Sequence, residues 1–308
     1  MKKFITIIFS FLLLFSLSSC GLKKDIKEIK MPSGEKWDED DIEDYLEGFK
    51  EYLEQLEDTP EKTVSQWYSV SGDFIVEQKD EDDSDNWTKA LVNVSGKIYD
   101  SAYAFERKAK ITIKAKAEAS YKSSEDEEAE LSDIDAKATI IYIKGVAYVA
   151  VETKTKTESE TTTEKRYMKG ELDDMNIGIG EFGDLDGLFG SNTSITEGLR
   201  TALYSVLESL KSYFEENDET IDIELLKTKA GFASTIEYKP AKEETDKAKY
   251  SAQVVWEVDS KKYTTKKIEV YLDYSLGKEQ QIEGRIVIKK ARTGSVSAPS
   301  NLDKYEEA

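Results

Sequence analysis

The chain has 308 residues, with 63 acidic and 43 basic side chains, a net charge of −20 and no histidine. A surface this negative repels nucleic acid and anionic headgroups, so we expect no nucleic-acid partner, and it favours a monomer. The lack of histidine excludes Ser-His-Asp triads and the usual zinc sites. Catalytic sites built from paired carboxylates or a Ser-Lys dyad need no histidine, but the sequence contains neither at a recognisable spacing. We therefore expect no enzyme and no cofactor.

Residues 1–19 have the features of a signal peptide. Lys2 and Lys3 precede an apolar segment, residues 4–17, that is too short to remain as a membrane-spanning helix. The following Leu17-Ser18-Ser19-Cys20 resembles the lipobox of bacterial lipoproteins, and Cys20 is the only cysteine. The alternative is an ordinary secretory signal with an incidental cysteine. The resemblance implies that Cys20 is acylated and that the protein faces outward from a bacterial cell membrane, with the outer membrane not excluded.

The rest of the chain divides into a tether, one domain and a tail. Residues 20–36, which include Pro32 and Gly34, have little periodicity and are expected to form the lipidated tether. Residues 37–300 are expected to form a single α+β domain, followed by a tail at residues 301–308. Within the domain, residues 38–57 repeat apolar side chains at helical spacing and begin with acidic residues, as helices favour. A capping box at Ser194 and Glu197 begins a second amphipathic helix that extends to about residue 216.

Alternating apolar and polar residues predict strands in most of the remaining chain. Residues 87–99, 103–121 and 134–158 alternate, with a turn expected at Lys144-Gly145, and a threonine-rich hairpin follows. For residues 67–76 a strand and a short helix are both open. Four runs between residues 230 and 291 are joined by short turns, which indicates an antiparallel meander. The fold class we predict is a long curved antiparallel sheet, or incomplete barrel, packed on two amphipathic helices.

The order of these elements resembles a known family. A lipobox, a helix, a meander containing "IIYIKGVAYVAV", a second helix and a second meander are similar to the LolA/LprG-type lipoproteins. The resemblance implies a curved, incomplete β-barrel closed by helices around an apolar cavity that carries acyl chains in several members.

The strand at residues 107–121 has unusually small residues on its apolar face. Four alanines there leave space that a closely packed helix or a ligand must fill, and the two predicted helices favour the first. The expected lining of a ligand cavity comprises Ala109, Ile111, Ile113, Ala115, Ala117, Ile140, Tyr142, Phe232, Ile236, Val254 and Trp256. The lysines on the other face either pair with acidic residues across strands, which we favour, or face anionic lipid.

A loop around residues 175–190 is rich in apolar side chains and either packs on its own domain or covers a cavity mouth or a membrane. As a lid it would use Ile177, Ile179, Phe182, Leu185, Leu188 and Phe189. Its literal G-x-G-x-x-G match lacks the strand and helix of a nucleotide site. The acidic runs at 80–85 and 125–130 lack the EF-hand pattern, so we expect no metal site.

Together these features predict an anchored, non-enzymatic protein that binds a lipid or other apolar ligand between sheet and helices. The alternative is a surface interaction or structural lipoprotein with a filled core, which contacts another protein. A transporter's solute-binding protein is disfavoured because strands and helices do not alternate.

Overall fold

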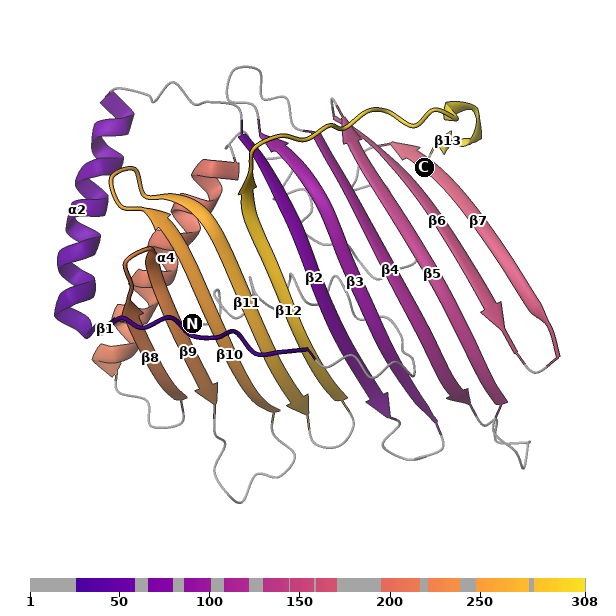
Figure 1. Cartoon of the computed structure of the whole chain (residues 1–308), viewed down its shortest axis with the longest axis horizontal. Helices are drawn as coiled ribbons and strands as arrows, with labels where there is room; N and C mark the ends of the chain where they lie inside the picture. Colours follow the sequence, from indigo (N-terminus) through magenta and orange to yellow (C-terminus); the bar gives the residue numbers. More distant parts are fainter. Residues whose placement is uncertain are drawn as a thin grey trace.

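A computed structural model describes residues 26–58, 66–79, 86–100, 108–121, 130–143, 145–157, 159–170, 195–216, 221–238, 248–276 and 280–307. Thirteen strands in these segments form one open sheet in the order β1-β8-β9-β10-β11-β12-β2-β3-β4-β5-β6-β7-β13 (Figure 1). Nearly every neighbouring pair is antiparallel, and two helices contact each other beside the sheet. The predicted α+β class and antiparallel sheet are confirmed.

The sheet consists of two meanders. The first comprises β2 (Gln66–Lys79), β3 (Trp87–Asp100), β4 (Lys108–Tyr121), β5 (Glu130–Ile143), β6 (Val146–Lys156) and β7 (Thr161–Gly170). The second comprises β8 (Ile221–Lys227), β9 (Gly231–Tyr238), β10 (Ala248–Asp259), β11 (Thr264–Leu276) and β12 (Gln280–Ala291). The predicted turn between β5 and β6 is present, and its Gly145 has a φ of 82°, which glycine adopts without strain.

The two meanders meet where β12 pairs with β2, from Gln280 opposite Gln78 to Ala291 opposite Trp67. In this pairing Gly284 lies opposite Phe74, whose side chain is only 2% exposed. The Phe74 ring occupies the space above Gly284, so a Cβ at that position would collide with it. A large side chain on one strand thus fills the space that a glycine leaves on its neighbour.

Side chains that alternate along each strand give the sheet two different faces. The face that we call inner is apolar from β8 through β12 and β2 to β5 and part of β6, and its buried side chains include Val92, Ile113, Leu225 and Trp256. The opposite, outer face is largely polar. This alternation is the signal from which most of the strands were predicted.

Helices α2 (Glu39–Asp58) and α4 (Ile195–Glu216) pack on the inner face toward its β8–β11 end (Figure 1). Both match the predicted helices. Phe49 of α2 is fully buried and stacks on Tyr263, with ring centroids 4.2 Å apart and planes inclined by 11°. Tyr263 lies in the turn after β10 with a φ of 49°, an uncommon conformation for a non-glycine residue. The stacked rings fix α2 against that turn.

The N-terminal segment crosses the outer face over β8 to β12 (Figure 1). Ile26 and Ile29 are each 6% exposed and pack on an apolar strip that includes Ala233, Val255 and Tyr271. The amide N–H of Ile29 donates to Gln253 Oε1 at 2.7 Å. The described part of the predicted tether is therefore packed on the domain, and it ends as β1 (Glu35–Lys36), which pairs with β8.

The C-terminal segment returns along the other half of the sheet (Figure 1). After a short 3-10 helix (Leu302–Lys304), Tyr305 is 9% exposed, with its ring 5.6 Å from that of Tyr148 and 5.4 Å from that of Tyr167. β13 (Glu306–Glu307) then pairs in parallel with β7. At each edge of the sheet a two-residue strand thus pairs with part of β8 or β7, which shields the backbone groups at those positions.

One strand was not predicted from the sequence, and for one segment the structure decides between two predictions. β8 was not predicted, although Ile221, Ile223 and Leu225 alternate with polar residues, because the strand is short and directly follows the end of a helical pattern. Residues 67–76, for which a strand or a short helix was expected, belong to β2, a central strand that joins the two meanders.

We predict that Gly284→Ala destabilises the protein by about 1–3 kcal/mol, because the added methyl group overpacks the Phe74 ring. Urea unfolding would measure the change in free energy of unfolding. The double variant Gly284→Ala with Phe74→Leu should recover part of the loss, since the smaller side chain makes room. Equal stability of Gly284→Ala and the parent chain would contradict this account of the pairing.

Candidate functional site

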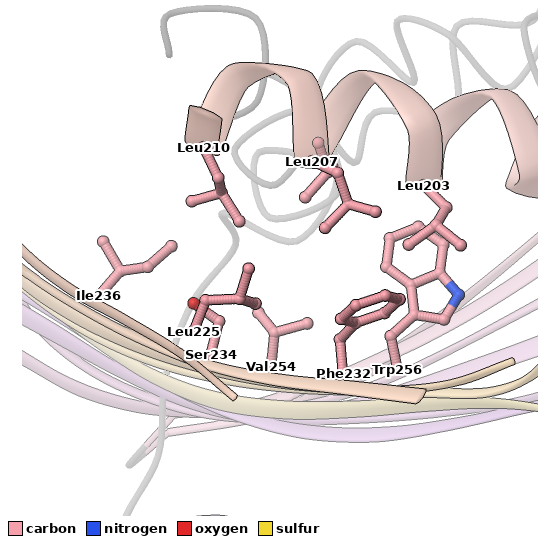
Figure 2. A pocket seen from close by; sticks show the side chains of 10 residues that line it. Leu203, Leu207, Leu210, Leu225, Phe232, Ser234, Ile236, Val254 and Trp256 are labelled. Carbon is pink, nitrogen blue, oxygen red and sulfur yellow. The ribbon is translucent and has the colours of Figure 1, made fainter. Parts of the chain in front are cut away.

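A small hollow lies between α4 and the inner face of β8–β10. Leucines spaced three and four residues apart on α4 point toward the sheet, while side chains from the three strands point toward the helix (Figure 2). Its volume is about 20 Å³, room for one water molecule or one methyl group. The lining consists of Leu203, Val206, Leu207, Leu210, Leu225, Phe232, Ser234, Ile236, Val254 and Trp256.

Ser234 is the polar exception in this lining. It lies on β9, is 7% exposed, and its buried hydroxyl has no hydrogen-bond partner among the described residues. The indole N–H of Trp256 donates to Thr265 Oγ1 at 2.8 Å, so that polar group is already satisfied. A buried hydroxyl without a partner costs about 1–3 kcal/mol. The accessible lining of the hollow is entirely apolar, so a water molecule there would lack the roughly three hydrogen bonds that buried waters typically make.

A lysine surrounded by aromatic rings lies next to the hollow. The Lys227 Nζ is 4.2 Å from the ring centroid of Phe232, 4.4 Å from that of Tyr45 and 5.0 Å from that of Trp37. Phe232 belongs both to this cage and to the lining of the hollow. Burial lowers the pKa of Lys227, and within the described residues no carboxylate forms an ion pair with it. The rings stabilise the cation in place of a counter-ion.

The hollow and the caged lysine together form a site with an apolar interior and one positive group at its margin. This arrangement suits a molecule that has a hydrocarbon part and an anionic or hydrogen-bonding end. Among the residues that the structure describes, no group of three or more Asp, Glu, Cys or His side chains could hold a metal ion. In the same part of the chain, no helix combines the length and apolar character needed to cross a membrane.

The residues predicted to line a cavity fall into two groups. Phe232, Ile236, Val254 and Trp256 lie together in the hollow. The others are on β4 and β5, which β11, β12, β2 and β3 separate from β10. In that second group Ala109, Ile113 and Ile140 are buried, Ile111, Ala115 and Tyr142 are half-buried, and the side chain of Ala117 is outside the described residues.

The alanines of β4 are placed away from the helices. Ala109 lies opposite Ile98 on β3 and Tyr142 on β5, so large neighbours flank the small side chain. Helices α2 and α4 gather at the β8–β11 end of the inner face, not over β4 (Figure 1). Cys20 and the residues predicted to form a lid (Ile177, Ile179, Phe182, Leu185, Leu188 and Phe189) are outside the described residues.

Several residues of the site were missed by the sequence analysis. The α4 leucines were recognised as the apolar face of a helix, but nothing in their spacing gives the part of the sheet that they face. Leu225 and Lys227 belong to β8, the unpredicted strand. Ser234 alternates in phase with Phe232 and Ile236 in "GFASTIEY", and this phase places a hydroxyl on the apolar face of β9.

Comparisons with known proteins give no family. No protein-family model matches the chain, and no curated protein matches it. A crystal structure of a β-barrel-like protein of domain of unknown function DUF1849 from Brucella abortus is 10% identical with a TM-score of 0.22, covering 74% of this chain and 99% of that one. The translocator domain of autotransporter NalP from Neisseria meningitidis is 8% identical with a TM-score of 0.21, covering 82% and 98%. The resemblance to LolA-like lipoproteins therefore rests on sequence features alone.

We predict that Ser234→Val stabilises the protein by about 1 kcal/mol or more, since it removes the unpaired hydroxyl and adds one methyl group to the hollow. Urea unfolding would measure the difference. Ser251→Val, on the outer face of neighbouring β10, is the matched control and should change stability by less. A lower free energy of unfolding for Ser234→Val would show that the hydroxyl is satisfied or that the hollow is already filled.

Proposed function

We propose that this protein is a lipid-anchored, extracytoplasmic protein that binds a lipid or another apolar molecule between α4 and β8–β10. The observation that carries the proposal is a hollow whose accessible lining is entirely apolar, with the unpaired Ser234 hydroxyl buried beside it. A ligand with a hydrocarbon part and one polar group would enter the hollow and, as α4 moves away from the sheet, supply the missing hydrogen bond to Ser234. Anchoring at Cys20 and the ligand-binding role expected of LolA-like lipoproteins are parts of this proposal.

The size of the hollow sets a condition on how such a ligand binds. Because about 20 Å³ accommodates one methyl group, a longer chain must separate α4 from the sheet. Separation exposes the α4 leucines, each worth about 1.5–3 kcal/mol when buried, so the ligand must cover them again. The side chains on both sides of the hollow are apolar and would form the walls of the widened site.

The caged lysine gives the ligand a direction. Lys227 is half-buried and adjoins the hollow through Phe232, so an anionic end of a bound molecule would meet the ammonium group there. The hydrocarbon part would then extend beneath α4 past Ser234. Fatty acids and anionic lipids have this arrangement of groups.

The same small volume favours a second candidate, a lipoprotein with a filled core that contacts other proteins and binds no ligand. In that case α4 stays packed on the sheet, and the missing hydrogen bond of the Ser234 hydroxyl is a small loss of stability that the fold tolerates. The first candidate predicts that an apolar molecule co-purifies with the protein and that changes to the hollow remove it. The second predicts no such molecule.

We predict that the protein purified from its own membrane carries an apolar molecule, which native mass spectrometry would detect as added mass. Ser234→Val should reduce the bound fraction severalfold because the added methyl group occupies the hollow. Ser251→Val, with the same chemical change on the outer face, should retain it. If the parent protein carries no added mass, ligand binding is refuted and the filled-core candidate is favoured.

For the anchor, we predict that Cys20→Ser releases the protein into the soluble fraction, since no thiol remains to carry the acyl groups. Fractionation of cells and mass spectrometry of the N-terminal peptide would measure this. Lys24→Ser, just outside the lipobox, is the control and should leave the protein in the membrane. Retention of Cys20→Ser in the membrane fraction would refute acylation as the attachment.

A further inference from the structure

Four exposed lysines on the outer face oppose one another directly across strands. The register of β3, β4 and β5 places Lys97 opposite Lys110 and Lys114 opposite Lys137. None of the four forms an ion pair within the described residues. We call these residues the lysine patch.

Beside the patch, lysines lie opposite acidic residues, and within it Lys137 also lies opposite Glu152 on β6, whose carboxylate forms an ion pair with Lys165. Lys116 lies opposite Asp135 on β5, and Glu118 lies opposite Lys89 on β3. Like charges directly opposite each other are destabilising in a sheet. In a chain with 63 acidic and 43 basic residues, the two lysine pairs still lack an acidic partner of their own, since Glu152, the acidic residue opposite Lys137, forms its ion pair with Lys165.

Small hydroxyl side chains fill the space between the two lysine pairs. Ser95, Thr112 and Thr139 lie opposite one another in the row midway between them. The two lysine rows are four residues apart along the strands, about 13 Å. The patch is thus a flat strip of hydroxyl groups bordered by ammonium groups on both sides, which is the chemistry that binds phosphate.

The start of the described chain lies on this same face. Arg285 on β12 donates to the carbonyl of Lys27 at 3.2 Å. Across the sheet, the residue opposite Arg285 is Asp73, followed by Asn93 and then Lys114. Three strand spacings, about 14 Å, therefore separate the N-terminal segment from the patch.

The predicted anchor is close to this point. Cys20 precedes Ile26 by six residues, which span at most about 20 Å even when fully extended. An acyl chain on Cys20 would therefore hold the outer face, and not the inner face with its helices, near the bilayer surface.

We propose that the lysine patch docks on the anionic phospholipid headgroups of the membrane that holds the anchor. Lys97, Lys110, Lys114 and Lys137 would contact headgroup phosphates, whose charge removes the repulsion between the paired lysines. The hollow beneath α4 then faces away from the bilayer. This proposal rests on the acylation of Cys20 proposed above.

The test measures how close the outer face lies to lipid in the full-length acylated protein. Thr112→Cys places a single fluorophore in the middle of the patch, because Cys20 is the only other cysteine and is blocked. Ser95→Cys, in the same row, replaces it if the first variant folds poorly, and Lys50→Cys on α2 is the reference. The proteins are inserted into phosphatidylcholine vesicles with or without phosphatidylglycerol, together with a lipid that carries a quencher on its headgroup.

We expect quenching at residue 112 to exceed that at residue 50 severalfold in vesicles with phosphatidylglycerol, and to fall at high salt. Lys110→Glu, Lys114→Glu and Lys137→Glu together should lower it to the level at residue 50. The matched control is the triple variant Lys50→Glu, Lys229→Glu and Lys261→Glu. It changes the net charge equally on exposed residues outside the patch and should leave quenching at residue 112 unchanged.

Flotation of the vesicles separates the two proposals. If the protein floats with the vesicles but residue 112 is quenched no more than residue 50, the anchor holds and the docking surface is overturned. The same conclusion follows if both triple variants reduce quenching equally. If the protein without substitutions does not float with the vesicles, the acyl anchor is refuted. The orientation of the outer face toward the bilayer is then refuted as well, because it was inferred from the anchor.

Discussion

The pairing of β12 with β2 is the constraint on which the rest of the architecture depends. It joins two meanders whose strands are otherwise hydrogen-bonded to near neighbours in the sequence, and it aligns their apolar faces into one continuous inner face. Its register is defined by shape, since Phe74 on β2 covers Gly284 on β12. A slip of one residue would turn the apolar side chains of a whole meander to the outer face. This alignment also places the lysine patch of the first meander on the same face as the N-terminal segment, which packs on the second.

The two faces of the sheet are stabilised by different chemistry. The inner face is held by apolar burial, whereas the outer face beneath the N-terminal segment contains a buried ionic group, Glu269, which is 4% exposed. Burial raises the pKa of the Glu269 carboxyl, but hydrogen bonds from Lys267 and Arg285 outweigh it and hold the pKa below its usual range. Arg285 also donates to the backbone of Lys27 and so links this charge cluster to the N-terminal segment. An unpaired carboxylate would not be stable at this depth.

Alternation and helical periodicity were sufficient to predict both helices and most strands, because those patterns record which side of an element faces the core. They could not predict what each element faces. The residues of β4 and those of β9 and β10 have the same apolar pattern, yet only the second group lies beneath α4. The opposition of Lys97 with Lys110 likewise depends on a register between strands that neither strand specifies alone. Ser234 was visible as a serine in an apolar phase, but its lack of a partner is a property of the packed structure.

The strands that close the two edges also impose an order on folding. β1 precedes α2 in the sequence but pairs with β8, and the apolar strip beneath the N-terminal segment is built from β9, β10 and β11. During synthesis this segment is made before the strands that it contacts, which belong to the C-terminal third of the chain. Contacts between such distant parts of a chain form slowly. Until the second meander is complete, Ile26 and Ile29 have no surface to cover, so the docking of this segment is a late step in folding.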